Sequence, residues 1–128
     1  MGKAKYETMS IDELFTSMQE AAINAHEAAM NDGPVEKQHA WIDILTAVIE
    51  EIRNRGNEAL QSYLPLLHAS HPAVRLSAAL AARKFAPSTA VPVLEELSDG
   101  KYGGDIAMNA RTTLNGMRKR GLLPQINT

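Results

Sequence analysis

Apolar residues recur at helical spacing in two long stretches of the first half of the chain. In the first stretch, the apolar positions are 11, 14, 15, 18, 22, 25 and 29, and in the second they are 41, 45, 48, 49 and 52, with Ile42 on the flank. Steps of three and four residues place side chains on one face of an α-helix. The pattern therefore predicts two amphipathic helices of about 20 residues each.

The residues at the ends of these stretches predict where the helices begin and end. Ser10 and Glu13 have the spacing of a capping box, in which each side chain accepts a hydrogen bond from the other residue's N–H. The segment 31–34, Asn-Asp-Gly-Pro, separates the two helices, and Gly56 closes the second. So short a link predicts an antiparallel hairpin over 10–56, with Trp41 in its core. Residues 1–9 lack a period and are expected to be a loose lead-in.

After residue 56 the predicted helices become shorter, richer in alanine and interrupted by proline. Asn57 is expected to cap a helix over 58–68, and Pro72 to open a second helix. Pro65 lies inside the first of these helices, where it removes a backbone hydrogen bond and bends the chain. These two helices form one repeat unit.

A second unit follows the same plan. A helix is expected over 89–97, with Pro92 inside it, and another over 106–119, capped by Asp105. The apolar positions of the two units align: Leu64, Leu67, Val74, Ala78 and Ala82 with Leu94, Leu97, Ile106, Ala110 and Leu114. A helix pair of this kind buries its apolar face by stacking on its neighbours. The sequence thus predicts one all-α domain over 1–128 with about six helices: the hairpin, two units over 57–121 and a tail over 122–128.

The first unit resembles the HEAT repeat in the segments Leu64-Pro65-Leu66-Leu67, His71-Pro72-Ala73-Val74-Arg75 and Ala78-Ala79. The second unit departs from this pattern, because Ala107 stands where the arginine is expected and its turn is two residues longer. The repeat of roughly 30 residues is also short for a family in which about 40 is usual.

The chain as a whole resembles a small bacterial family of HEAT-like helical proteins known only as a domain of unknown function. That resemblance implies a fold, and it brings no catalytic residue to this sequence. In HEAT proteins the arginine at the position of Arg75 usually pairs within the stack and ties one repeat to the preceding one. A structural role with a carboxylate or carbonyl partner is therefore expected for Arg75.

Composition narrows the range of functions. The chain has 128 residues, 45% of them hydrophobic, and no cysteine, which excludes disulfides and thiolate chemistry. It has no apolar run of membrane-spanning length and no signal-peptide core, so a soluble, cytoplasmic protein is expected. The net charge of −2 is unevenly divided: residues 1–56 hold five basic and ten acidic side chains, and residues 57–128 hold eight and five. Such polarity favours an oriented interaction surface.

Nothing in the sequence indicates an enzyme or a cofactor. It contains no nucleophile with a recognisable base, no phosphate-binding glycine loop and no nucleotide fingerprint. The four histidines form two separate pairs, His26 with His39 and His68 with His71, whereas zinc needs three or four ligands. We therefore expect no metal site, and interpret His68 and His71 as turn and capping residues.

The second helix of each unit usually lines the concave face of such a stack. The polar residues expected there are Arg83, Lys84, Asn109, Thr113 and Arg118. They favour a non-enzymatic protein–protein interaction module, one version of which is an immunity- or antitoxin-like protein that masks its partner.

Two alternatives remain open. The first is a nucleic-acid-binding protein related in style to the HEAT-like DNA glycosylases that remove alkylated bases, although a sequence pI near 6.1 lacks the basic excess typical of such binders. The second is a self-associating structural protein, a homodimer in which Ile23, Ile44 and the apolar tail form the contact.

Overall fold

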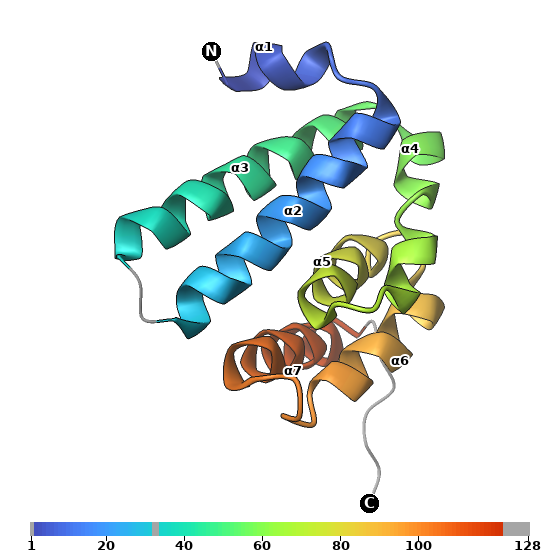
Figure 1. Ribbon diagram of the computed structural model, residues 1–128. Helices are drawn as coiled ribbons and strands as arrows, with labels where there is room; N and C mark the ends of the chain where they lie inside the picture. The colour runs from blue at the N-terminus through green and yellow to red at the C-terminus, as the bar shows by residue number, and fades with distance from the viewer. Residues whose placement is uncertain (1, 32–33, 122–128) are drawn as a thin grey trace, which may run out of the picture. The chain divides into compact units, whose positions relative to one another are not determined.

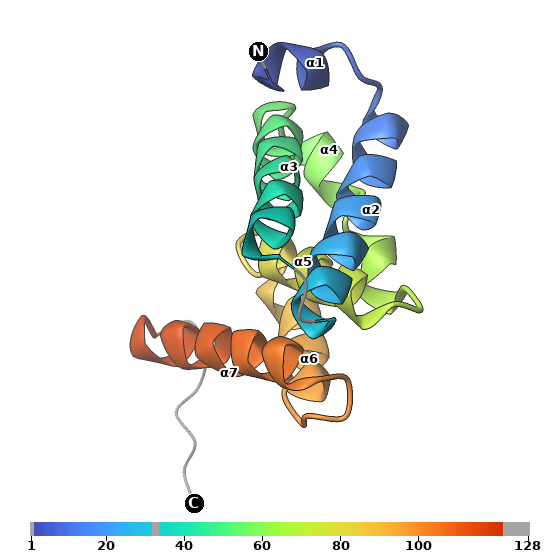
Figure 2. The same cartoon turned by 60° about the vertical axis from the view of Figure 1, so that its left-hand side comes forward.

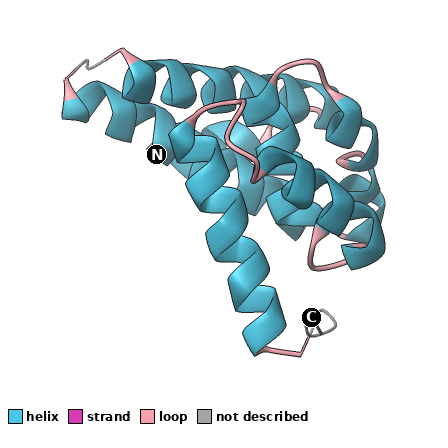
Figure 3. Cartoon of the chain, turned by 90° about the horizontal axis from the view of Figure 1, so that it is seen from below, coloured by secondary structure: helices cyan, strands magenta, loops and turns pink. Residues whose placement is uncertain are grey.

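The computed structural model describes residues 2–31 and 34–121, and all regular structure in these residues is helical (Figure 3). Seven α-helices and one 3₁₀-helix are present in this part of the chain, with no strand among them. The all-α class predicted from the sequence is confirmed. The predicted tail over 122–128 lies outside the described residues.

The contacts of the chain group into two compact parts, where the sequence predicts a single domain. We call them unit 1 (1–62) and unit 2 (63–128), and they differ from the two repeats predicted over 57–121. The division sharpens the charge asymmetry. Unit 1 holds five basic and eleven acidic residues, a net charge of −6, and unit 2 holds eight basic and four acidic residues, a net charge of +4. Each unit therefore carries charge of one predominant sign.

Unit 1 is built on the predicted helical hairpin. Helix α2 (Ile11–Met30) and helix α3 (Val35–Asn54) lie side by side and antiparallel (Figures 1 and 2). The capping box begins α2 as expected: the Glu13 N–H donates to Ser10 Oγ at 3.1 Å, and the Ser10 N–H donates to Glu13 Oε1 at 2.8 Å.

The hairpin core lies in the N-terminal half of α2 and the C-terminal half of α3. Its buried residues are Leu14, Phe15, Met18, Ala21, Ala22, Val48 and Ile52. Trp41 is only half-buried, so its predicted place in the core is wrong. Antiparallel pairing puts Trp41 opposite the stretch of α2 that holds Ala25, Ala28 and Ala29, whose side chains are too short to cover an indole.

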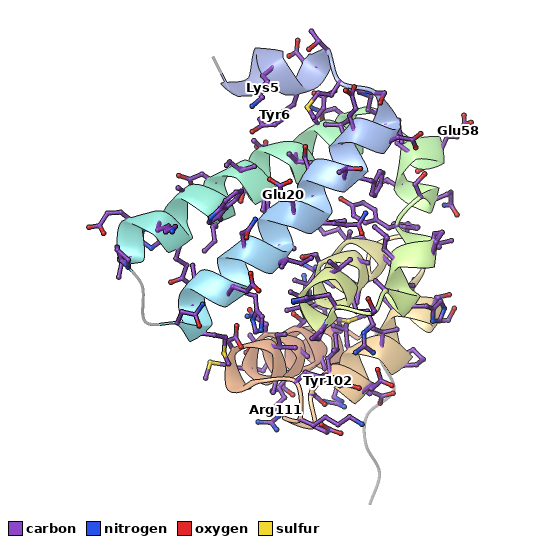
Figure 4. All side chains as sticks on the ribbon, in the orientation of Figure 1. Lys5, Tyr6, Glu20, Glu58, Tyr102 and Arg111 are labelled. Carbon is purple, nitrogen blue, oxygen red and sulfur yellow. The ribbon has the colours of Figure 1, made fainter. Side chains whose placement is uncertain are left out.

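The segment expected to be a loose lead-in contains a helix, α1 (Gly2–Glu7), which packs on α3. The Tyr6 side chain is buried and lies between these two helices (Figure 4). Arg55 Nη2 also donates to the carbonyl oxygens of Tyr6, Glu7 and Met9, at 3.1, 3.3 and 2.8 Å. A guanidinium more than 45 residues away thus satisfies the end of α1, and no local pattern of apolar residues encodes that contact.

The helix expected over 58–68 is divided into two shorter ones. Helix α4 (Asn57–Gln61) is preceded by Gly56, which takes the N-cap position expected for Asn57 with φ of +94°. The 3₁₀-helix η1 (Leu64–His68) then begins with Pro65 in its first turn. Because proline has no N–H to donate to the Gln61 carbonyl, the α-helical hydrogen bonds cannot continue through this point.

Unit 2 contains η1 and three helices: α5 (Pro72–Ala82), α6 (Pro87–Leu97) and α7 (Gly104–Lys119). The apolar positions that align between the two repeats are buried, except Leu64, which is half-buried. Pro92 lies inside α6 as predicted. Asp105 does not cap α7, because the helix begins at Gly104, two residues earlier than expected, and Gly103 holds the cap position.

His71 caps α5, with its Nδ1 accepting a hydrogen bond from the Ala73 N–H at 3.0 Å, which agrees with the capping role expected for it.

The connections of unit 2 determine the directions of its helices. Short links over 83–86 and 98–103 reverse the chain twice, and α6 packs against both α5 and α7. Helices α5 and α7, both seen nearly end-on in Figure 1, therefore run in the same general direction, and their C-terminal ends lie on the same side of the unit.

Candidate functional site

The five residues predicted to line a binding surface are divided between the C-terminal ends of α5 and α7 and the interior of α7. Arg83 and Lys84 directly follow α5, and Arg118 lies in the last turn of α7, on the same side of unit 2. Asn109 lies nine residues earlier, about 13 Å away along the helix axis, and donates to the Asp105 carbonyl oxygen at 3.0 Å. Thr113 is half-buried between them. The structure thus brings three of the five together.

Two further cations complete this cluster, which we call the basic end. Its members are Arg83, Lys84, Arg118, Lys119 and Arg120. Lys119 and Arg120 are exposed, and neither is among the residues predicted from the sequence. Three consecutive basic residues before Gly121 were the available signal, although a basic last turn is common in helices for reasons of stability alone.

The guanidinium groups at the two helix ends are held in similar ways. Arg83 is the C-cap of α5, and its Nη1 donates to the Leu80 carbonyl oxygen. Arg120 is the C-cap of α7, and its Nε donates to the Gly116 carbonyl oxygen at 3.2 Å. Each arginine therefore uses one N–H on its own last turn and keeps further donors for another group.

Both burial and a neighbouring positive charge affect Arg83. Partial burial lowers the pKa of its guanidinium below the ordinary value, and the positive charge of Arg120 lowers it further. Electrostatic repulsion between two cations is screened beyond about 8 Å at physiological ionic strength. The two arginines thus form a like-charged pair at one end of unit 2.

Three cations elsewhere in the chain have carboxylate partners. Arg55 Nε lies 2.7 Å from Glu51 Oε2, Lys101 Nζ lies 3.9 Å from Asp99 Oδ2, and Arg75 pairs with Glu96. In contrast, no carboxylate of residues 2–31 and 34–121 forms an ion pair with the following members of the basic end: Arg83, Lys84, Lys119 and Arg120. The basic end therefore keeps its positive charge largely uncompensated.

Arg75 has the internal role expected for it. Its ion pair with Glu96 joins α5 to the following helix, α6, rather than to the preceding repeat, and its guanidinium lies 4.7 Å from the centre of the Tyr102 ring. Beside it is a shallow depression of about 310 Å³. The residues that line the depression are Leu67, His68, Arg75, Pro92, Val93 and Glu96. Because the arginine is already paired, this depression offers less free charge than the basic end.

Two other features, a cluster of metal ligands and a membrane-spanning helix, are absent from the residues that the structure describes. Among these residues, no three histidine, aspartate or glutamate side chains are grouped closely enough to hold a metal ion. Within the same residues, no helix is both long enough and apolar enough to cross a membrane.

Comparisons with known proteins extend the description of the fold. No family model matches the chain, and a search of curated proteins finds no match. Among solved structures, the chain is similar to the protein RPA1889 from Rhodopseudomonas palustris CGA009, with a TM-score of 0.81 and 18% sequence identity. The similarity covers 93% of this chain and 97% of the other. At this level of identity the two proteins share a fold, and the all-α chain therefore has a counterpart of nearly the same extent among known structures.

Proposed function

We propose that the protein is a non-enzymatic binding module, which acts in the cytoplasm and uses the basic end of unit 2 to bind a partner protein with an acidic surface. The observation that carries the proposal is the concentration of unpaired cations at this end. Four of its five cations have no carboxylate partner among the described residues, whereas the unpaired Lys37 and Arg53 lie 16 residues apart on α3.

Compensation of the helix dipoles accounts for only part of the positive charge at the basic end. The C-terminus of a helix carries a partial charge of about −0.5, so the ends of α5 and α7 together supply about −1 against five formal positive charges. Most of the positive charge therefore has no role in compensating the helix dipoles. Positive charge that is not needed for folding and is concentrated on one side of a unit favours association with an acidic partner.

The size of the basic end supports a protein partner over nucleic acid. The chain has a net charge of −2 and a sequence pI near 6.1, whereas nucleic-acid-binding domains usually carry a strong basic stripe and a pI above about 9. A local cluster of five cations suits an acidic patch on a protein. Masking of such a patch is the form of an immunity- or antitoxin-like role that fits this geometry.

The test is capture of partner proteins from nuclease-treated lysate of the source organism by the tagged chain, with two matched charge-reversal variants. Lys84→Glu combined with Lys119→Glu changes two exposed residues of the basic end. Lys37→Glu combined with Arg53→Glu makes the same change in charge on exposed residues of α3. We expect the first variant to lose the partner and the second to retain it. Equal capture by both variants would place the binding surface elsewhere.

A further inference from the structure

The basic end contains a feature more specific than positive charge, namely its pair of capping arginines. Arg83 ends α5 and Arg120 ends α7, and the parallel course of these helices places both caps on one side of unit 2. The lysines of the cluster are point charges on flexible stems, whereas a guanidinium presents a planar fork of donors. The two arginines therefore determine which chemical group fits the site best.

Both guanidinium groups are held in place before any partner binds. Arg83 is fixed by its bond to the Leu80 carbonyl oxygen and Arg120 by its bond to the Gly116 carbonyl oxygen. Side chains that are already ordered lose less conformational entropy on binding than free surface side chains do. The packing of α5 on α7 keeps both positive charges on one side of the unit, so an anion that contacts both offsets their mutual repulsion.

We propose, on the basis of the function proposed above, that Arg83 and Arg120 together bind a phosphoryl group on the partner protein. A carboxylate carries one charge and two oxygen atoms, which is enough for a single guanidinium fork. Two neighbouring guanidiniums would need two carboxylates, which repel each other when brought together. One phosphoryl group carries a charge of about −1.5 to −2 at neutral pH and three acceptor oxygens, and it can accept from both arginines at once.

The first experiment titrates the intact chain with inorganic phosphate at constant ionic strength, using sodium chloride as the reference, and follows the backbone amide signals by NMR. We expect phosphate-specific shifts at the ends of α5 and α7. Arg83→Gln and Arg120→Gln should each weaken phosphate binding about tenfold, the value of one charge-assisted hydrogen bond. Arg111→Gln removes an exposed guanidinium elsewhere on α7 and should leave binding unchanged.

Arg83 is half-buried, so the melting temperature of its variant must be measured, and the exposed Arg120 provides a second, independent test. Absence of phosphate shifts, or shifts that survive both substitutions, would overturn the proposal. Stronger binding of glutarate than of phosphate would do the same, because it would favour paired carboxylates.

A second experiment identifies the source of the phosphoryl group by comparing three probes: a phosphoserine peptide, the same peptide with glutamate in place of phosphoserine, and a single-stranded oligonucleotide. Preference for the phosphopeptide supports the proposal, and preference for the oligonucleotide overturns it in favour of nucleic acid. Failure here is distinct from failure of the proposed function. An acidic partner lost on reversal of Lys84 and Lys119 would still support the binding module, even if phosphate did not bind.

Discussion

The contact between Arg55 and the end of α1 offers the sharpest test of the fold, because one side chain holds a segment that is distant in the sequence. Arg55 Nη2 faces three carbonyl oxygens, those of Tyr6, Glu7 and Met9, and its Nε binds Glu51. The perturbation is Arg55→Met, which keeps most of the apolar stem of the side chain and removes every donor. We expect α1 to detach locally while the hairpin of α2 and α3 stays folded.

The magnitude follows from the number of donors. Nη2 carries two hydrogens for three carbonyl groups, so it makes about two effective bonds, each contributing roughly 1 kcal/mol after exchange with water. The side chain of Arg55 is 25% exposed, and its pair with Glu51 lies within α3 and does not hold α1. The expected loss is therefore about 2 kcal/mol in the free energy of local opening of α1.

Tryptic cleavage after the exposed Lys5 measures this opening directly, because the protease needs an extended backbone and α1 contains the scissile bond. When opening is fast relative to cleavage, a loss of 2 kcal/mol raises the cleavage rate about 30-fold. Arg53→Met is the matched control, since Arg53 is exposed on the same helix and has no hydrogen-bond or ion-pair partner among the described residues. Equal cleavage rates at Lys5 in the two variants would refute the account of how α1 is held.

Three further predictions concern global stability and are measured by chemical denaturation. Leu94→Ala, at a fully buried position of α6, should cost about 2–5 kcal/mol, and Leu64→Ala, at the aligned but half-buried position, should cost clearly less; equal losses would contradict the difference in packing between the repeats. Trp41→Ala should cost less than the roughly 3–5 kcal/mol typical of a core tryptophan, because the indole is half-buried. Gly56→Ala should destabilise by about 1–2 kcal/mol through its φ of +94° alone, since an added Cβ meets no atom within 4 Å, whereas Gly116→Ala within α7 should stabilise by up to about 1 kcal/mol.

The parts of the fold that could be predicted are those encoded by local pattern. The capping box at Ser10, the ends of α2 and the buried positions of both repeats follow from apolar spacing and from the chemistry of helix ends. The role of His71 as a cap was also visible, because it directly precedes a proline that begins a helix. These features depend on residues within a few positions of one another.

The parts that could not be predicted depend on distant contacts. The helix α1 is held by Arg55 and by burial of Tyr6 on α3, and neither contact has a signature among residues 1–9. The exposure of Trp41 depends on which residues of α2 lie opposite, which a stripe on one helix does not specify. For the candidate site, the sequence indicated Arg83, and only the packing of α5 on α7 brings Arg120 to the same side.

The distribution of ion pairs separates the charges that build the molecule from those available for binding. Arg55 and Arg75 connect segments of the fold and are half-buried, so removal of either would leave backbone carbonyls or a carboxylate without a donor. Lys84 and Lys119 are exposed and unpaired within the described residues, so their loss removes no contact of the fold. Lys37 and Arg53 are likewise exposed and unpaired, but they lie 16 residues apart on α3, whereas four unpaired cations gather at the basic end. That concentration of unpaired charge on one side of unit 2 is the basis for proposing that the basic end binds a partner.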